Sequence, residues 1–148
     1  MQEYPHHYVA SAVARTGSNV QVASPGLENI ESAGPAEFGG PGDLWSPETL
    51  LVAAVADCFI LSFRAIARAS RFDWNSISCD VVGTLERVEK VTRFTEFELR
   101  VTLEIPGEMK EARALRLLEK AEHSCLITNS MTSQTVLEAD IRAKELVA

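Results

Sequence analysis

Apolar and polar side chains alternate along residues 94–105, and this two-residue period is typical of a β-strand with one buried face. One face of the strand carries large apolar side chains: Phe97, Leu99, Val101, Leu103 and Ile105. Residues 77–91 predict a second long strand, joined to the first around residues 90–93. We expect the two strands to form an antiparallel sheet with one face toward solvent.

A long helix is predicted to begin after Ser46. A hydroxyl residue at the N-cap, Pro47 at the first helical position and Glu48 in the first turn all favour a helix start. The helix should run to about Ser70, and residues 50–56 in its first half are apolar on every side. We therefore expect protein to surround this helix on most sides, as the central helix of the fold.

The remaining segments complete an α+β domain. Residues 8–22 predict a β-hairpin, and residues 24–43, rich in Gly and Pro, predict an irregular loop. Residues 111–124 have the 3.6-residue apolar spacing of a second helix, and residues 133–142 predict a last strand. No internal repeat or linker is visible, so residues 1–148 are predicted to form a single domain.

The composition is that of a compact globular domain, with 148 residues of which 46% are hydrophobic and 24% charged. The net charge is -7, from 14 basic and 21 acidic residues, so we expect neither a nucleic acid nor an anionic membrane as a partner. The most apolar window, residues 50–63, is too short to span a bilayer and contains Asp57. The first residues lack the pattern of a secretory signal, so a cytoplasmic location is expected.

The three cysteines, Cys58, Cys79 and Cys125, are the first candidates for chemistry. They form no Cys-x-x-Cys pair and no zinc-ligand spacing, so we expect no metal site. Cys58 lies in the most apolar part of the first helix, where a cysteine either packs as a small hydrophobic side chain or reacts. Cys125 ends the apolar stripe of the second helix beside polar residues, and both roles are open there too. Cys79 lies in a predicted strand without an activating feature, which favours a structural role.

Three segments together resemble the family of osmotically induced protein C and organic hydroperoxide resistance proteins (OsmC/Ohr). They are the GGPG sequence at residues 39–42, the stretch from SPETLL to ADC that ends at Cys58, and AEHSC, which ends at Cys125. The order of the expected elements also matches, and the resemblance covers nearly the whole chain. It implies an intertwined homodimer with antiparallel sheets around two long helices per chain, the central helix carrying Cys58.

The resemblance also implies catalytic roles for four residues. Cys58 would attack the peroxide, and Cys125 would resolve the product as a Cys58–Cys125 disulfide. Glu48 matches a glutamate at the helix start that, in the family, holds an activating arginine of the N-terminal hairpin. Arg15 is the candidate for that arginine, because it is the only arginine before residue 64.

Helix geometry adds an expectation about how a dimer would build the site. Glu48 and Cys58 are ten residues apart, about 15 Å along the axis of a continuous helix, so one chain cannot bring the two side chains together. We therefore expect a composite site. Cys58 and Cys125 would come from one chain, and Glu48, with Arg15 as its candidate companion, from the other.

The expected function is a thiol-dependent peroxidase of the antioxidant stress response, which reduces organic hydroperoxides to alcohols and hydrogen peroxide less efficiently. The resemblance implies no bound cofactor, but an external dithiol reductant such as a lipoyl group. Apolar residues near Cys58, among them Phe59, Leu61 and Phe63, either wall a pocket for a peroxide tail or belong to the core. One alternative is a non-catalytic dimer of this fold that binds a small apolar ligand. Another is a different sulfur transfer, in which Cys125 does not resolve.

Overall fold

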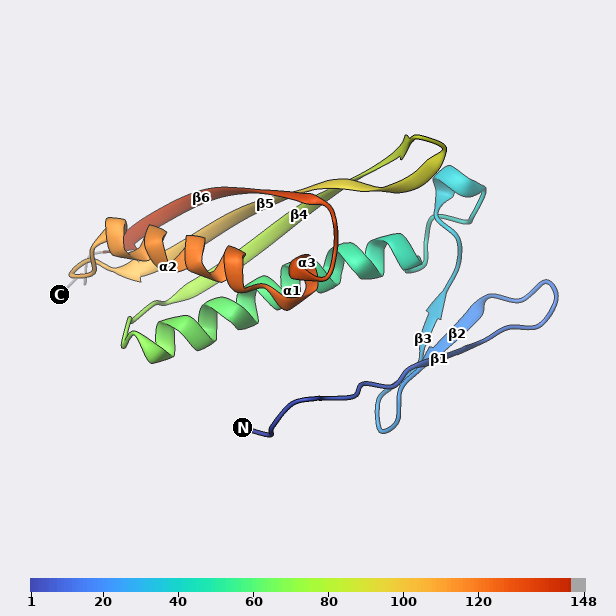
Figure 1. Cartoon of the computed structure of the whole chain (residues 1–148), viewed down its shortest axis with the longest axis horizontal. Coiled ribbons are helices and arrows are strands. Elements are labelled where there is room, and N and C mark those ends of the chain that lie inside the picture. The colour runs from blue at the N-terminus through green and yellow to red at the C-terminus, as the bar shows by residue number, and fades with distance from the viewer. Residues whose placement is uncertain (145–148) are drawn as a thin grey trace. The chain divides into compact units, whose positions relative to one another are not determined.

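The computed structural model describes residues 1–144, which fall into two compact units divided after Leu51. The first unit contains a small sheet, and the second contains a larger sheet with the long helices (Figure 1). These elements confirm the predicted α+β class. The assignment of residues 1–148 to a single domain stays a prediction.

The sheet of the first unit is antiparallel, in the order β1 (Ser11–Val13), β2 (Val20–Ala23) and β3 (Ile30–Ser32). The first two strands confirm the hairpin predicted over residues 8–22. The third strand corrects the sequence analysis, because it lies inside residues 24–43, which were predicted to be an irregular loop. The same segment also contains a short 3₁₀ helix, η1 (Ala36–Phe38).

The connection between β2 and β3 explains this difference. Ser24 accepts a hydrogen bond from the N–H of Leu27 across Pro25 and Gly26, and Gly26 has a φ of 78°. A proline followed by a glycine with positive φ is the arrangement of a type II turn. The chain therefore reverses at Gly26, and the residues that follow pair with β2 although they number only three.

Helix α1 (Pro47–Ala69) begins where the sequence predicts. The N–H of Thr49 donates to Oγ of Ser46 at 3.1 Å, and the N–H of Ser46 donates to Oγ1 of Thr49 at 2.8 Å. These reciprocal bonds satisfy two backbone donors at the helix start, and Pro47 has no N–H to satisfy. The helix ends at Ala69, one residue before the predicted end.

The sheet of the second unit has the order β4 (Ser76–Val88), β5 (Val91–Pro106) and β6 (Gln134–Lys144). The antiparallel pairing of β4 with β5 confirms the prediction, but β6 lies parallel to β5, so the expectation of purely antiparallel sheets is wrong. Between β5 and β6 the chain runs through α2 (Glu111–Ser124) and α3 (Leu126–Asn129). This long connection returns the chain to the end of the sheet where β5 begins, and a parallel pair requires such a crossover.

The turn between β4 and β5 consists of Glu89 and Lys90, slightly earlier than predicted. Both residues have positive φ, 50° and 68°, as in the two-residue turns that match the twist of a hairpin. Asn and Gly are the residues that usually mark such turns, and their absence explains the displaced prediction.

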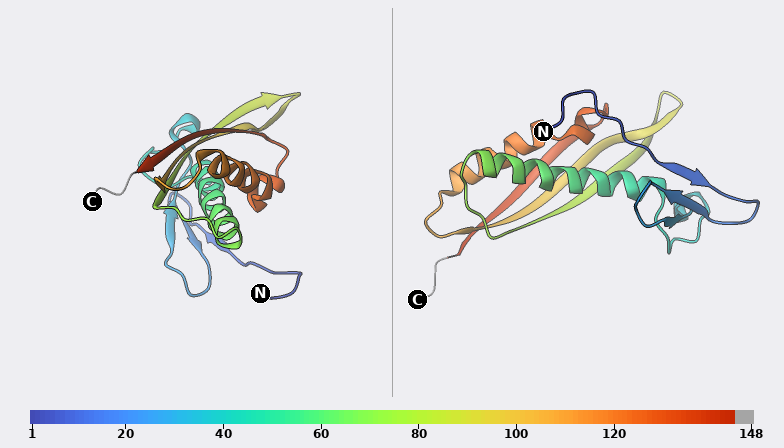
Figure 2. Two further views of the ribbon diagram at one scale, coloured as in Figure 1. Left: turned by 90° about the vertical axis from the view of Figure 1, so that its left-hand side faces the viewer. Right: turned by 90° about the horizontal axis from the view of Figure 1, so that it is seen from below.

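Helices α1 and α2 lie on the same face of this sheet (Figure 2). The face of β5 predicted to be apolar is fully buried, which confirms its assignment. The helices contribute the other half of the core: Val55, Phe59, Phe63 and Ala67 from α1, and Ala114, Leu117, Leu118 and Ala121 from α2. At Gly83 of β4 an added Cβ would lie 2.9 Å from Cγ2 of Val52, so helix and sheet approach closely there.

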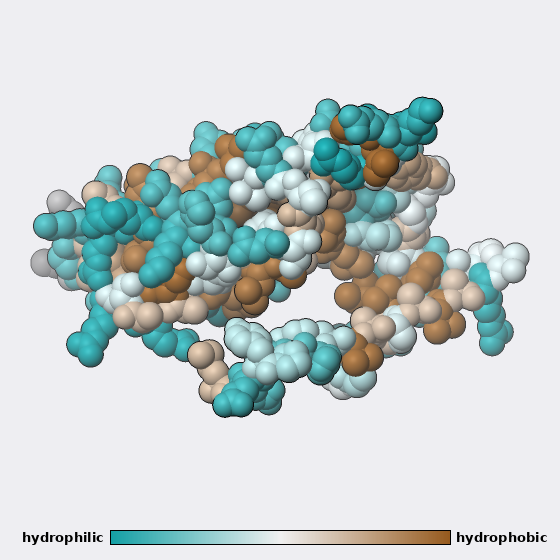
Figure 3. Space-filling model, viewed as in Figure 1, coloured by the Kyte–Doolittle hydropathy of each residue, from teal (hydrophilic) through white to brown (hydrophobic). Residues whose placement is uncertain are grey.

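Only one face of α1 is buried by residues 1–144. Over its most apolar 18 residues, with a mean hydropathy of 2.1, just 22% are buried. The helix is thus less enclosed than its sequence predicts, and apolar residues reach the surface of this unit along the side where α1 runs (Figure 3). By length and composition alone α1 would be long enough to cross a membrane, but core helices of soluble proteins pass the same test, so the expectation that α1 is a core helix stays a prediction.

Candidate active site

Cys58 and Cys125 lie on different elements of the second unit and face each other. Cys58 projects from the middle of α1 and is half-buried, whereas Cys125 is 1% exposed. The two thiols lie within hydrogen-bonding reach of one another, and both are free. The structure therefore brings together the two cysteines that the sequence analysis paired through the family resemblance.

Cys125 occupies the break between two helical segments. It has extended backbone angles, φ −64° and ψ 113°, which end α2 and allow α3 to start in a new direction. Its carbonyl accepts bonds from the N–H of Asn129 at 3.0 Å and from Oγ1 of Thr128 at 3.2 Å, so the turn of α3 is fixed to it. The N–H groups of Leu126 and Ile127, at the start of that turn, point at the sulfur of Cys58.

The environment within one chain raises the pKa of the Cys58 thiol. Burial is the main cause, and the neighbouring thiol of Cys125 adds to it. The N–H groups of Ile127 and Leu126 act in the opposite direction, because they stabilise the thiolate. The thiolate is the reactive form of cysteine, so the described residues alone do not activate Cys58.

Cys79 of β4 lies on the helix side of the sheet, opposite Val101 of β5. Its pKa is raised to about 12, mainly by burial and further by Asp80 and Cys125. It therefore stays a protonated thiol at physiological pH. This environment agrees with the structural role expected from the sequence.

Glu48 and Arg15 both belong to the first unit. Glu48 lies in the first turn of α1, and its Oε2 atom is buried without a hydrogen-bond partner among residues 1–144. Arg15 is exposed in the turn after β1, where its N–H donates to Oγ of Ser18 at 2.9 Å. Neither residue takes part in the ion pairs of the described chain. The cysteines are thus the one pair of predicted site residues that the structure brings together.

Two aromatic residues suggested as pocket walls belong to the core instead. Phe59 and Phe63 are fully buried, while Leu61 on the same helix is 53% exposed. Leu126, which follows Cys125, is 70% exposed. Each cysteine is therefore followed, within three residues, by a large apolar side chain at the surface.

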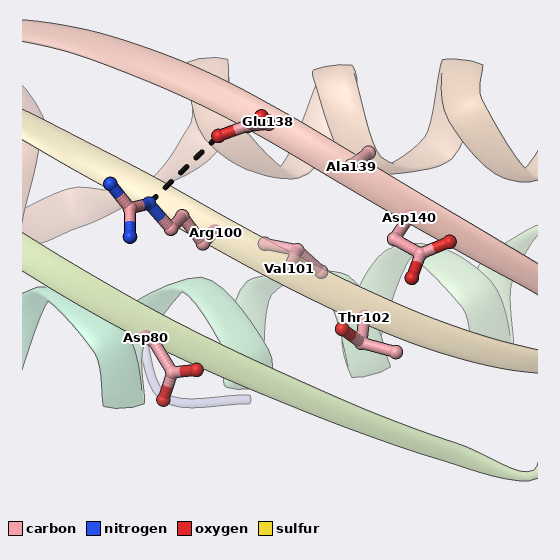
Figure 4. Close-up of a pocket in the computed structure, with 7 residues that line it drawn as sticks. All are labelled: Asp80, Arg100, Val101, Thr102, Glu138, Ala139 and Asp140. Atoms are coloured by element: carbon pink, nitrogen blue, oxygen red, sulfur yellow. Dashed lines mark ion pairs between the residues drawn. The ribbon is translucent and has the colours of Figure 1, made fainter.

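A shallow pocket of about 420 Å³ lies on the other face of the sheet (Figure 4). Its charged side chains come from all three strands: Asp80, Arg100, Glu138 and Asp140. Arg100 is partly neutralised there, because its Nε lies 3.1 Å from Oε1 of Glu98 and 3.9 Å from Oε2 of Glu138. No cluster of three or more His, Cys, Asp or Glu side chains suited to a metal ion occurs within residues 1–144.

Comparisons with known proteins identify one family and several proteins of similar fold. The family model described as "OsmC-like protein" matches residues 40–140. The uncharacterized protein YmaD of Bacillus subtilis is 24% identical over 113 residues, 74% of this chain and 75% of that protein. Among solved structures, an OsmC-like protein of unknown function from Vibrio cholerae has a TM-score of 0.83 at 21% identity, over 92% of this chain and 100% of that one. An organic hydroperoxide resistance protein from Elizabethkingia anophelis has a TM-score of 0.77 at 21% identity, over 97% and 100% of the two chains.

Proposed function

This chain belongs to the OsmC-like protein family, and from that premise we propose that it is a cysteine-based peroxidase. The Cys58 thiolate attacks the O–O bond of a hydroperoxide, and Cys58 becomes a sulfenic acid. The alkoxide that leaves takes up one proton and becomes an alcohol. The Cys125 thiol then attacks the sulfenic sulfur, forming the Cys58–Cys125 disulfide and releasing water. The two electrons taken up by the peroxide are restored when an external dithiol reduces this disulfide.

The observation that carries the proposal is the contact between the two thiols. Cys58 and Cys125 come from separate helices, and their thiols lie within hydrogen-bonding reach of each other. A resolving cysteine must reach the sulfenic acid before a second peroxide oxidises it further. The neighbouring position of the two thiols within one chain supports this step.

A cation must activate Cys58, because burial within one chain raises the pKa of its thiol. Arg15, held by Glu48, is the proposed source, as the family resemblance implies. The buried Oε2 atom of Glu48 lacks a partner among residues 1–144, and an arginine would supply one. A buried carboxylate oxygen without a partner is unfavourable, so the pairing would also stabilise the fold.

We assign the missing partner to a second copy of the chain. Helix α1 is continuous from Pro47 to Ala69, so Glu48 and Cys58 stand about 15 Å apart along its axis. The uncovered apolar surface of α1 would be buried in a homodimer. Each site would then combine Cys58 and Cys125 of one chain with Glu48 and Arg15 of its partner.

The proposed substrates are organic hydroperoxides, with hydrogen peroxide a poorer one. A relative with the same fold is named as an organic hydroperoxide resistance protein. The exposed apolar side chains of Leu61 and Leu126 flank the cysteines and suit an apolar peroxide tail better than water. We propose a lipoyl-type dithiol as reductant and the cytoplasm as location, because a thiol cycle of this kind needs a reducing compartment.

The test is to treat the reduced full-length protein with one equivalent of cumene hydroperoxide, cap the remaining thiols and map the cysteines by peptide mass. The proposal predicts loss of two thiols and a Cys58–Cys125 linkage within seconds, faster than with hydrogen peroxide. Cys79 should be capped as a free thiol in every sample. Three free thiols after minutes would refute the peroxidase.

The raised pKa of Cys58 is the observation that favours the alternative, a dimer that binds a small apolar ligand without catalysis. In that case no cation reaches Cys58, and the thiols are simply packed. The amount of a hydrophobic fluorescent probe bound would then follow the concentration of dimer. It would be the same for reduced and oxidised cysteines. A peroxidase should bind such a probe differently after oxidation, because the disulfide replaces two free thiols at the binding surface.

A further inference from the structure

Ser62 is the one hydroxyl side chain between Leu50 and Ala69, in the most apolar helix of the chain. It lies one turn after Cys58 on the same face of α1, and it is half-buried. Its Oγ atom is 4.0 Å from the sulfur of Cys58. A polar group in such surroundings calls for an explanation beyond packing.

The orientation of Ser62 is also unusual for a helical serine. Such hydroxyls commonly donate to the carbonyl four residues earlier, as Ser124 does to Lys120 and Ser130 does to Leu126, both at 2.8 Å. Ser62 instead turns toward the side chain of Cys58, and this thiol is its partner within residues 1–144. The hydroxyl is therefore available to the sulfur.

We infer that Ser62 is a positioning residue for the proposed reaction, whose hydroxyl donates a hydrogen bond to the Cys58 thiolate. The inference rests on the peroxidase role proposed above. Two other donors already face this sulfur, the N–H groups of Leu126 and Ile127. Ser62 completes a set of three, which approach from α1 itself and from the turn after Cys125. An anionic sulfur needs several donors where water is excluded.

The pairing changes the proton equilibrium of Cys58 in one direction. A donor to the thiolate favours the charged form, so Ser62 lowers the pKa of Cys58 against the effect of burial. Within residues 1–144, the ionisable group that raises the pKa of Cys58 is Cys125, which also raises that of Cys79. Removing the hydroxyl should therefore change the titration of Cys58 without disturbing a charged neighbour.

The test measures the rate at which iodoacetamide alkylates Cys58 in the reduced full-length protein, from pH 6 to 10, with the Cys58 peptide quantified by mass. For Ser62→Ala we expect alkylation about threefold to tenfold slower at pH 7, because a rise of one unit in the pKa of Cys58 lowers its thiolate fraction about tenfold. At high pH the rate should match or exceed that of the unchanged protein, since a more basic thiolate is intrinsically more nucleophilic. A merely structural defect would lower the rate at every pH.

Matched variants separate the effect of the hydroxyl group from the effect of side-chain shape. Ser62→Thr keeps the donor and should stay within about twofold of the original rate. Valine has nearly the shape of threonine but no hydroxyl, so Ser62→Val should behave like Ser62→Ala. Ser70→Ala makes the same deletion just after the end of α1 and should leave the alkylation of Cys58 unchanged. Coincident profiles for Ser62→Thr and Ser62→Val would overturn the inference. Because alkylation needs no peroxide, a shifted profile in a protein that forms no disulfide would refute the peroxidase and leave only the hydrogen bond from Ser62 to the Cys58 thiolate standing.

Discussion

The sulfur of Cys58, on α1, and the sulfur of Cys125, after α2, lie within hydrogen-bonding reach of each other. This contact depends on the close approach of two helices that cover one face of a mixed sheet. It also depends on the extended backbone of Cys125, which ends α2 at the level of Cys58. A disulfide between them would join α1 to the end of α2 inside the second unit.

Replacing Cys125 should separate the two halves of the proposed reaction. In Cys125→Ser, Cys58 still consumes one equivalent of peroxide, but no thiol resolves the sulfenic acid, so turnover with a dithiol should fall at least about tenfold. Dimedone should label Cys58, as read by peptide mass. The matched control Cys79→Ser should keep full turnover. Unchanged turnover in Cys125→Ser would favour the single-cysteine sulfur transfer instead.

Cys79 predicts a pH dependence of stability. Its pKa is about 12 in the folded chain and has an ordinary value of 9.0, so between these values the unfolded thiol loses its proton while the folded one keeps it. The unfolded state then binds fewer protons, and the free energy of unfolding falls as pH rises from about 9 toward 12.

The difference between the original protein and Cys79→Ala isolates this effect, because all other ionisable groups are common to both. Urea unfolding in reducing buffer at pH 8, 9, 10 and 11 should show a constant difference up to pH 9. Above that pH the original protein should lose stability faster than Cys79→Ala. Parallel curves over the whole range would show that the Cys79 thiol is not held protonated by the fold.

The periodic segments of the sequence were sufficient to predict most of the fold. The alternation in residues 94–105 and the cap at Ser46 are local signals, and the structure confirms both. The parallel pairing of β6 has no local signal, because parallel and antiparallel partners share the same side-chain period. The strand β3 was missed because three residues are too few for a periodic pattern, although the Pro25–Gly26 turn ahead of it was a usable sign.

The candidate site was predictable only in part. The sequence identifies Cys58 and Cys125, but their contact is a property of tertiary packing. Ser62 was missed as a candidate, although its four-residue spacing from Cys58 on a predicted helix was visible in the sequence. The partial burial of α1 was also unpredictable, because an apolar helix gives no sign of whether its own chain or another molecule covers it.

Gly83 tests how closely α1 packs on the sheet. A Cβ at this position would lie 2.9 Å from Cγ2 of Val52 and 3.0 Å from the ring of Phe97. Neither the β-branched valine nor the buried ring moves easily, so Gly83→Ala should destabilise the fold by about 1–3 kcal/mol. Chemical denaturation measures the change. Gly34→Ala is the control, because its added Cβ has no neighbour within 4 Å, and equal stability of the two variants would contradict the close packing.

The composite site can be tested by the arrangement of two substitutions in mixed dimers, prepared with two affinity tags. In the trans arrangement, one chain carries Cys58→Ser and its partner carries Glu48→Gln. A composite site then leaves one intact pair, the Glu48 of the first chain with the Cys58 of the second. We expect about half the peroxidase rate of the original dimer, although neither parent dimer turns over.

The cis arrangement gives the opposite expectation. When one chain carries both substitutions and its partner is unchanged, each composite site lacks either Cys58 or Glu48, so the mixed dimer should be inactive. Sites formed within single chains would reverse the two results, because the unchanged chain would then keep a complete site. The two dimers contain the same substitutions in the same number, so a defect in folding or in dimer formation affects both alike. The direction of the difference between the two rates therefore reports which chain supplies Glu48, and its size grows with the effect of Glu48→Gln on the rate.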